Sequence, residues 1–502
     1  MTLSSSLYAS YFNGQAMLLA EIPVLPIAQF RDIVIERVQS GLRISALFSA
    51  STGDDTGPEL FAVLTDDATA GIAVIRGDLG EKHYPALTPE CPQAHLFERA
   101  IAEDSNITPV GHPALKPVRF LAGTDGEPAP TIGEMPFFQV EGDEIHEVAV
   151  GPVHAGVIEP GHFRFQCDGE HVFHLEISLG YQHRGIETAL LGGPHKTSIH
   201  QVETIAGDTT IGHACAYVQA LEGLAEHTAA ARTQVIRAIA LELERLANHV
   251  GDLGALAGDV GFLPTQSMCG RLRGDFLNMS AMLCGNRFGR GLVRPGRSGF
   301  SLTDTIATEL AQRIRAVLRD TEEAVELLWD TASVLGRFEN TGVISREQCI
   351  AYGFVGPTAR ACGLERDIRA THPSGAYQFA TVPVATAHHG DVNSRAFVRW
   401  LEIRRAAKFL LDTLAAMPQE HTPEPMNSLA GNALAISLVE GWRGEICHAA
   451  ITDSDGRFAR YAIVDPSFHN WTALSLALRG QQISDFPLCN KSFNLSYCGF
   501  DR

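Results

Sequence analysis

The sequence predicts an α+β fold, with a small N-terminal α/β-sandwich-like domain followed by a mainly α-helical bundle that carries β-hairpins. Its 502 residues exceed the length at which one hydrophobic core stops growing, so we expect two domains. Short strand-like runs fill about the first hundred residues, whereas long stretches with helical apolar spacing fill the second half. Between them lies the linker-like stretch AGTDGEPAPTIGEMP. We therefore divide the chain into residues 1–130 and 131–502.

The first domain is expected to combine helices with short strands. Four apolar residues at helical spacing predict a helix within residues 22–41: Phe30, Ile33, Val34 and Val38. Gly41 ends this segment. Apolar alternation over residues 42–48 predicts a strand, and the runs ELFAVLTDD and GIAVIRGDL predict two more. Residues 91–120 begin with helical spacing and become irregular where Pro and Gly recur.

The second domain is expected to open with a β-hairpin and to continue with helices. Asp168-Gly169 is a hairpin signal between strands at 163–166 and 172–177. Three long stretches then carry apolar residues on one helical face: residues 235–253, 310–328 and 397–414. Long amphipathic helices of this kind are typical of a helix bundle. Residues 444–464 return to strand character around a turn at Asp453–Gly456.

Charge and hydropathy narrow the classes of function. The chain has 58 acidic and 39 basic residues and a formal charge of −19, which argues against binding nucleic acid or a bare anionic membrane surface. It has no run of eighteen apolar residues, and its N-terminus lacks the basic start of a signal peptide. We therefore expect a cytoplasmic protein without direct membrane insertion, whose partners are other proteins.

Cysteine spacing and short motifs exclude several kinds of site. The ten cysteines are scattered and form no C-x-x-C pair, which suits reduced, buried thiols rather than a metal cage. The chain contains no Walker loop, no dinucleotide-binding GxGxxG unit, and no GxSxG or HExxH motif. His195, His200 and His213 have no cysteine or carboxylate at a standard zinc interval. We predict that the chain itself holds no metal and no cofactor.

Residues 179–222 concentrate the polar side chains on which a function could rest. They include these residues: Tyr181, His183, Arg184, Glu187, His195, His200, Glu203, Asp208, His213, Tyr217 and Glu222. Such a density of titratable groups is costly to bury unless the groups are paired. The stretch is therefore either a proton-handling or cofactor-facing surface, or a solvated loop between two helices.

Six motifs in residues 145–502 resemble, in order, the large subunit of membrane-bound, formate-hydrogenlyase-type nickel-iron hydrogenases and the homologous quinone-site large subunit of respiratory complex I. They are GYQHRGIE, LELERLANHVGDLGALAGDVGF, NRFGRGLVRPG, GPTARACGLERDIR, GDVNSR and EGWRGEICH. The first domain also resembles the small peripheral-arm subunit of complex I, because it keeps Glu98-Arg99 and Gly111-His112-Pro113. The resemblance implies that the two subunits are fused in one chain.

The resemblance also implies the loss of a metal centre. Two C-x-x-C pairs hold the nickel-iron centre of the hydrogenases, because soft thiolates bind and bridge these metals. Alignment of the motifs places the four ligand positions at Ala206, Thr209, Ser496 and Gly499. None of these residues is a cysteine. We therefore predict that the chain has no nickel-iron centre and no ordinary hydrogenase activity.

The shared HRGxE motif supplies two candidate catalytic residues, Arg184 and Glu187. In the relatives, the glutamate relays protons and the arginine lies near the cluster of a neighbouring small subunit. The alternative is a structural ion pair between the two side chains, which are three residues apart. Arg443 resembles the hydrogenase arginine that overhangs the metal, and without a metal it is expected to pair with a carboxylate.

The remaining candidates concern a quinone-like ligand. Tyr217 aligns with the tyrosine that holds the quinone headgroup in complex I, and His154 lies near the start of the loop that would supply its histidine partner. Ile158-Glu159 occupies the region of the second histidine, so only half of that site is present. Three further residues complete the predicted site: Asp208 and His213 as catalytic groups, and His183 as a cofactor-binding group.

The leading hypothesis is a peripheral subunit on the cytoplasmic side of a membrane-bound, ion-translocating oxidoreductase complex. The resemblance implies an iron–sulfur small subunit that carries a [4Fe-4S] cluster, since this chain has no cysteine set for one. It also implies antiporter-like membrane subunits, and it leaves a bound quinone open. The alternative is a catalytically inactive scaffold. The two differ in whether Tyr217, His213, Asp208 and Glu187 line one closed cavity.

Overall fold

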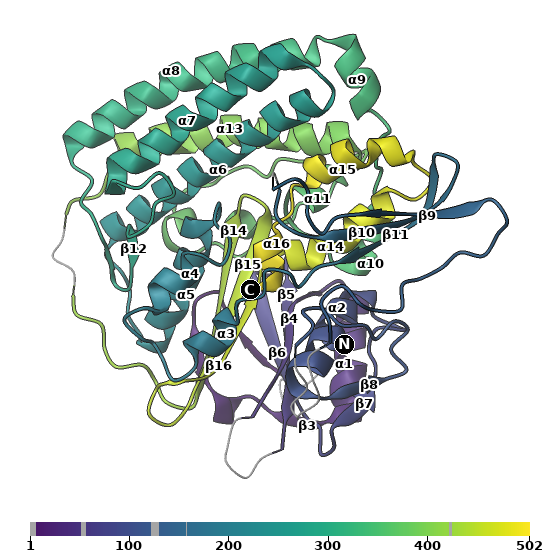
Figure 1. Ribbon diagram of the computed structural model, residues 1–502. Helices are drawn as coiled ribbons and strands as arrows, with labels where there is room; N and C mark the ends of the chain where they lie inside the picture. Colours follow the sequence, from purple (N-terminus) through teal and green to yellow (C-terminus); the bar gives the residue numbers. More distant parts are fainter. Residues whose placement is uncertain (1–6, 52–56, 122–129, 157, 421–423) are drawn as a thin grey trace.

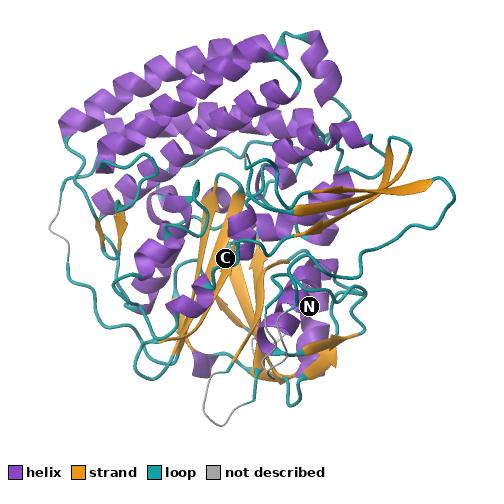
Figure 2. Ribbon diagram, in the orientation of Figure 1, coloured by secondary structure: helices purple, strands orange, loops and turns teal. Residues whose placement is uncertain are grey.

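The computed structural model describes residues 7–51, 57–121, 130–156, 158–420 and 424–502, and it has the predicted α+β composition. Figure 1 shows the long helices gathered on one side of the molecule, with the sheets beneath them, and Figure 2 separates helices from strands by colour. These helices are α6 (Ala231–Asp259), α7 (Leu263–Cys284), α8 (Asp304–Trp329) and α13 (Val392–Ala415). No helix in the described ranges is both long enough and apolar enough to cross a bilayer.

The N-terminal sheet has the strand order β1-β6-β5-β4, and β3 pairs with β6 in parallel. Its elements are β1 (Ala9–Tyr11), β3 (Val24–Pro26), β4 (Arg43–Ala50), β5 (Glu59–Asp66) and β6 (Gly71–Asp78). Helix α1 (Ile27–Gln39) packs against β6, where Phe30 lies so close to Gly77 that a side chain there would collide with it. The predicted helix and three strands are confirmed.

The segment predicted to turn irregular does so only in part. Helix α2 (His95–Ser105) ends at Asn106, whose φ of 53° turns the chain into β8 (Thr108–Val110). This strand pairs in parallel with β7 (His83–Pro85). Its Pro109 lies within a two-stranded sheet, where a missing N–H donor is tolerated.

One strand links the two predicted domains. Strand β2 (Ala16–Leu18) pairs with β14 (Ala433–Gly441) and completes a sheet of order β16-β15-β14-β2. The other members are β15 (Gly444–Thr452) and β16 (Phe458–Val464). Most of the expected linker falls on residues 122–129, which lie outside the described residues. The boundary at residue 130 stays a prediction, but the domains are joined by a strand and by a common core.

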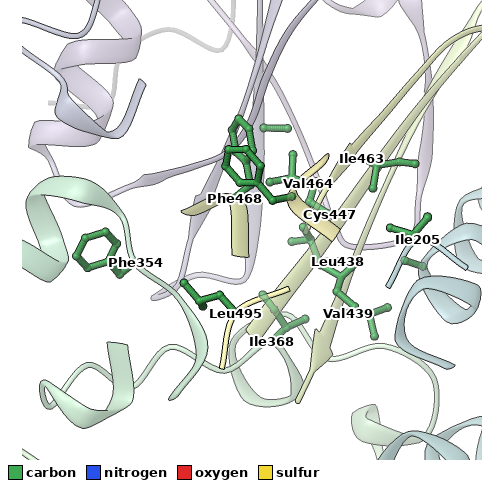
Figure 3. Packing of buried hydrophobic residues seen from close by; sticks show 14 of the residues in the cluster. Ile205, Phe354, Ile368, Leu438, Val439, Cys447, Ile463, Val464, Phe468 and Leu495 are labelled. Carbon is green, nitrogen blue, oxygen red and sulfur yellow. The ribbon is translucent and has the colours of Figure 1, made fainter. Parts of the chain in front are cut away.

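Every residue of β14 and β15 is buried. Helix α5 (Thr210–Leu224) packs against both strands, while β4 of the N-terminal sheet contacts β15 and β16. Figure 3 shows the apolar side chains that fill this region, among them Leu438, Cys447 and Ile463. The predicted turn at Asp453–Gly456 does connect β15 to β16.

A three-stranded sheet of order β11-β10-β9 lies beside the C-terminal helices (Figure 1). Its strands are β9 (Ile145–Val150), β10 (His162–Asp168) and β11 (His171–Ser178), and the predicted hairpin at Asp168-Gly169 is confirmed. The short helices are α3 (Ile186–Leu190), α4 (Ser198–Val202), α9 (Ala332–Phe338), α10 (Arg346–Tyr352), α11 (Gly356–Ala361), α12 (Ile368–Thr371), α14 (Pro466–Ala477), α15 (Phe486–Phe493) and α16 (Tyr497–Asp501). Strands β12 (Val293–Arg294) and β13 (Arg297–Ser298) form a small ladder.

His469 lies where α14 meets the N-terminal domain, with its ring centroid 5.6 Å from that of Phe97. Its side chain is buried, its Nε2 has no hydrogen-bond partner, and burial lowers its pKa to about 4. Folded His469 therefore stays neutral at pH values at which the unfolded chain, with an ordinary pKa of 6.5, takes up a proton. The stability that it contributes is present above pH 6.5 and is lost as the pH falls towards the folded value.

We expect His469→Phe to reduce the acid sensitivity of folding by about 1 kcal/mol between roughly pH 7 and pH 5.5. Denaturant unfolding at both pH values measures this difference. The exposed residue His389 provides the control, and His389→Ala should leave the pH dependence unaltered. Equal pH dependence in wild type and His469→Phe would contradict the prediction.

Candidate functional site

Residues 205–209 and 494–499 face each other, and two arginines bridge them. Arg184 donates hydrogen bonds to the carbonyl oxygens of Ile205 at 2.8 Å and Cys498 at 3.4 Å. Arg443 donates to the Thr209 hydroxyl at 3.3 Å and to the carbonyl oxygen of Asn494 at 2.6 Å. We call this meeting of the two segments the junction. It contains all four positions that the resemblance assigned to metal ligands.

A bidentate ion pair between Arg443 and Asp208 fills part of the junction. The two guanidinium Nη atoms lie 2.6 and 2.8 Å from the carboxylate oxygens. Arg443 is buried and stacks over the Trp442 ring at 3.9 Å, whereas the Asp208 side chain is 33% exposed. Burial opposes ionisation of Asp208, but Arg443 outweighs it and holds the pKa of this carboxyl below its usual value. Arg443 thus has the carboxylate partner that the sequence analysis expected for it.

Glu187 lies in the first turn of α3 and faces β16. Its carboxylate accepts a hydrogen bond from the Ile463 N–H at 2.7 Å and pairs with Arg460 at 3.0 Å and with Arg502. The predicted alternative of an ion pair between Arg184 and Glu187 is wrong. Gly185, with a φ of 64°, turns the chain between them, so that Arg184 points to the junction and Glu187 points to the sheet.

Glu187 and His183 line a cavity of about 550 Å³ between the N-terminal domain and β16. Its charged lining also includes Lys82, Asp104, Arg119, Arg460 and Arg502. His183 Nδ1 lies 2.8 Å from the carbonyl oxygen of Asp501. A carbonyl only accepts hydrogen bonds, so His183 Nδ1 carries the proton of this contact.

Tyr217 and His154 each have partners of their own. Tyr217 is buried against Tyr461 and Phe458, and its hydroxyl bonds the Ser198 side chain. Burial raises the pKa of Tyr217 to about 12. His154 lies in the loop between β9 and β10, where its Nε2 contacts the Gly161 carbonyl oxygen at 2.8 Å. The structure therefore does not bring together the two halves of the expected quinone-binding pair.

Nor do the other predicted catalytic residues share a cavity in the described part of the chain. Glu187 lines the 550 Å³ cavity, whereas Asp208 lines a separate void of about 10 Å³ beside Glu244. His213 is fully buried between His448 and Asp465. The dense polar stretch therefore supplies several separate sites, each with its own partners, and the single closed cavity is not formed.

A cluster of buried charged side chains contacts the chain just before Trp442-Arg443, and we call it the charged core. It comprises three arginines and four acids: Arg245, Arg360, Arg369, Glu242, Asp367, Glu402 and Glu440. Arg245 also donates to the carbonyl oxygens of Glu440 and Gly441, which come just before Trp442-Arg443. The charged core thereby fixes the turn that carries Arg443.

The surroundings in the charged core shift the pKa values of two of its glutamates in opposite directions. Burial, together with the nearby Asp367, raises the pKa of Glu440 to about 7. Burial also opposes ionisation of Glu402, but Arg360 and His249 outweigh it, so that its pKa lies well below the ordinary value. Glu440 belongs to the EGWRGEICH motif and Glu402 to the predicted helical stretch 397–414, and nothing in their spacing predicts that they meet.

Comparison with known proteins shows the family to which this chain belongs. Residues 259–431 match the model of the respiratory-chain NADH dehydrogenase, 49 Kd subunit, family. Formate hydrogenlyase subunit 5 of Escherichia coli (strain K12) is 30% identical over 448 residues, which cover 85% of this chain and 78% of that protein. The chain belongs to this family of hydrogenase and respiratory-chain large subunits.

Two further relatives show both branches of the family. The carbon monoxide-induced hydrogenase of Rhodospirillum rubrum is 31% identical over 355 residues, covering 70% of this chain and 97% of the relative. An NADH-quinone oxidoreductase subunit of Solibacter usitatus (strain Ellin6076) is 27% identical over 342 residues, covering 67% of this chain and 91% of the relative. The family resemblance in the motifs and the fold class are confirmed.

The residues of the junction do not fit the nickel-iron centre of the hydrogenase branch. A Cβ atom at Gly499 would lie 2.7 Å from Asp465 Cγ, so a side chain there would displace the carboxylate. Ser496 Oγ caps α16 by accepting a hydrogen bond from the Gly499 N–H. The Thr209 hydroxyl accepts a hydrogen bond from the Arg443 guanidinium. The neighbouring Cys498 is a thiol rather than a thiolate, since burial raises its pKa to about 11. Within the described ranges, no three His, Cys, Asp or Glu side chains gather as a metal site.

Several residues of the site were not predicted: Arg460, Arg502, His448, Tyr461 and Asp465. Asp465 had a local signal, because an acid followed by proline is typical of a helix N-terminus, and it does cap α14. His448 closes the EGWRGEICH motif, although the motif assigns it no role, and the others are ordinary strand or terminal residues in the sequence. Their partners come from α3 and α5, and this pairing exists only in the folded chain.

Proposed function

We propose that this chain is a peripheral subunit, on the cytoplasmic side, of a membrane-bound, ion-translocating oxidoreductase complex, and that it lacks a nickel-iron centre. Membership of a family whose named relatives belong to formate hydrogenlyase and NADH-quinone oxidoreductase supports the complex. The observation that carries the proposal is the Arg443–Asp208 ion pair at the junction, where the resemblance expects thiolate ligands.

The proposed partners supply the electron carrier and the ion path, for which the described part of this chain offers no site of its own. The electron carrier is a [4Fe-4S] cluster on an iron–sulfur small subunit, and the ion path belongs to antiporter-like membrane subunits. The match to formate hydrogenlyase subunit 5 is longer than the second predicted domain, which supports an N-terminal fusion. A quinone would not find the Tyr217–His154 pair of the complex I type, so any quinone site uses other residues.

We assign proton handling to Glu187, which lines the 550 Å³ cavity beside Arg460 and Arg502. Glu187→Gln keeps the shape of the side chain but cannot carry a proton. In the assembled complex we expect the coupled activity to fall by about 10²-fold or more. The loss of charge beside two arginines should cost only about 1–3 kcal/mol of stability.

The measurement compares turnover and assembly of the intact complex carrying Glu187→Gln with those of a complex carrying Glu147→Gln. Glu147 also pairs with an arginine, Arg164 at 2.8 Å, but it lies on β9 at the surface. The Glu147 variant should retain activity. Full activity in the Glu187 variant would remove this residue from the mechanism.

The scaffold alternative is favoured by one observation, namely that Tyr217, His213, Asp208 and Glu187 do not share a cavity among the described residues. If the chain is only a scaffold, Glu187→Gln should lower stability and leave turnover unchanged. The same experiment therefore separates the two functions.

A further inference from the structure

Four buried side chains form a continuous hydrogen-bonded line through the centre of the protein. The Tyr461 hydroxyl lies 2.9 Å from His448 Nδ1, His448 Nε2 lies 3.1 Å from His213 Nδ1, and His213 Nε2 lies 3.0 Å from Asp465 Oδ2. Each of these side chains is essentially fully buried. The line crosses from α5 to β15 and β16, and it ends at the first residue before α14.

The two ends of this line face different parts of the molecule. Asp465 lies beside Gly499 in the junction, where Arg443 and Asp208 act on it electrostatically. Tyr461 packs against Tyr217, with ring centroids 6.0 Å apart, and Tyr217 in turn bonds Ser198. The line therefore runs from the junction to the interior beside Tyr217.

The polarity of the line follows from Asp465. A carboxylate only accepts, so His213 Nε2 carries a proton. In a neutral His213, Nδ1 then accepts from His448 Nε2–H, and His448 Nδ1 accepts from the Tyr461 hydroxyl. Burial holds the pKa of His448 well below its usual value, which keeps that ring neutral. All three bonds are then satisfied, and every donor points towards Asp465.

We propose that Tyr461, His448, His213 and Asp465 form a proton-transfer chain that carries a proton between the interior beside Tyr217 and the junction. The Tyr461 proton passes to His448 Nδ1, the His448 Nε2 proton passes to His213 Nδ1, and Tyr461 regains a proton from the interior. One proton enters at Tyr461 and one positive charge arrives on His213 beside Asp465, without displacement of a heavy atom. This chain deepens the proposed function, on which it rests for the source of the protons.

Asp465→Asn tests the polarity because the backbone fixes the orientation of the new amide. Asp465 Oδ1 accepts the Ser467 N–H at 2.8 Å, so the asparagine oxygen must keep that place. The amide nitrogen then faces His213 Nε2 and donates to it. Both histidines must reverse, with protons on Nδ1 instead of Nε2. Asparagine is also a favoured N-cap, so α14 should still begin at the same residue.

The experiment records ring-nitrogen NMR spectra of the full chain labelled with ¹⁵N-histidine near pH 7. The two signals are assigned from their loss in His213→Gln and His448→Gln. We expect both histidines to be Nε2–H tautomers in the wild type and Nδ1–H tautomers in Asp465→Asn. An imidazolium at His213 in the wild type, or a tautomer that stays unchanged in Asp465→Asn, overturns the proposal.

A second measurement tests transfer in the intact complex. His448→Gln and Tyr461→Phe should each slow the coupled reaction by about tenfold or more. Ser437→Ala is the matched control, because Ser437 lies opposite His448 in the β14–β15 pairing and its hydroxyl has no hydrogen-bond partner. The control should keep wild-type turnover. If the tautomers are as expected but both variants keep wild-type turnover, the hydrogen bonds are ordered but carry no proton during the reaction. This result also overturns the proposal.

Discussion

Replacement of Glu402 by alanine is expected to destabilise the folded chain by about 3–5 kcal/mol. The side chain is 1% exposed, and its two oxygens hold Arg360 at 2.8 Å, His249 at 2.8 Å and Arg245 at 3.4 Å. Removal of the carboxylate takes one acidic partner from each of two buried guanidinium groups, and it takes the hydrogen-bond partner from His249. The free energy of unfolding of a native domain is only about 5–15 kcal/mol, so this one change removes a large fraction of it.

Denaturant unfolding of Glu402→Ala and of Glu309→Ala measures this effect. Glu309 also pairs with an arginine, Arg313 at 2.7 Å, but both side chains lie exposed on α8, and this change should cost less than about 1 kcal/mol. The effect of Glu402→Ala should also shrink in acid. The stability from its lowered pKa is fully present above the ordinary value of 4.5 and is lost as the pH falls through the folded value. Equal costs for the two variants would contradict the role of the charged core.

Replacement of Arg443 by methionine is the second change with a large expected effect, of about 2–4 kcal/mol. It removes the bidentate partner of Asp208 and leaves the Asn494 carbonyl oxygen without its donor. The lower end of the range reflects the exposure of Asp208, because water solvates part of the unpaired carboxylate. The two segments of the junction should also separate more easily.

Hydrogen exchange of amides in residues 205–209 and 494–499 measures this separation alongside the stability. We expect faster exchange at both segments in Arg443→Met and no change at α8. Arg313→Met is the matched control, since its arginine pairs only at the surface. Unchanged exchange at the junction would mean that Arg443 does not hold the two segments together.

The elements that sequence analysis predicted are those with a clear local pattern. Helices α1, α6, α8 and α13 carry apolar residues at helical spacing, and strands β4 to β6 are short apolar runs, although the fold buries them almost completely. Strand β14 is also buried throughout, and it was not predicted. Helix α7 was missed because Pro264, Gly270 and Gly274 interrupt its apolar pattern.

The candidate site was predicted less completely than the fold, since its chemistry depends on residues from distant segments. The HRGxE motif identified Glu187, but the arginines that bind it, Arg460 and Arg502, come from β16 and from the C-terminal segment. The expected Arg184–Glu187 pair was wrong because one glycine with a positive φ turns the two side chains apart. No spacing rule could have predicted that Asp465 and His448 would bracket His213.

Metal analysis of the purified intact complex, with an assay for hydrogen evolution, tests whether the junction of residues 205–209 and 494–499 holds the Arg443–Asp208 ion pair instead of a nickel-iron centre. We expect iron from the cluster of the small subunit, no stoichiometric nickel, and no hydrogen evolution. About one nickel per chain, together with hydrogen evolution, would show that the junction does hold a nickel-iron centre.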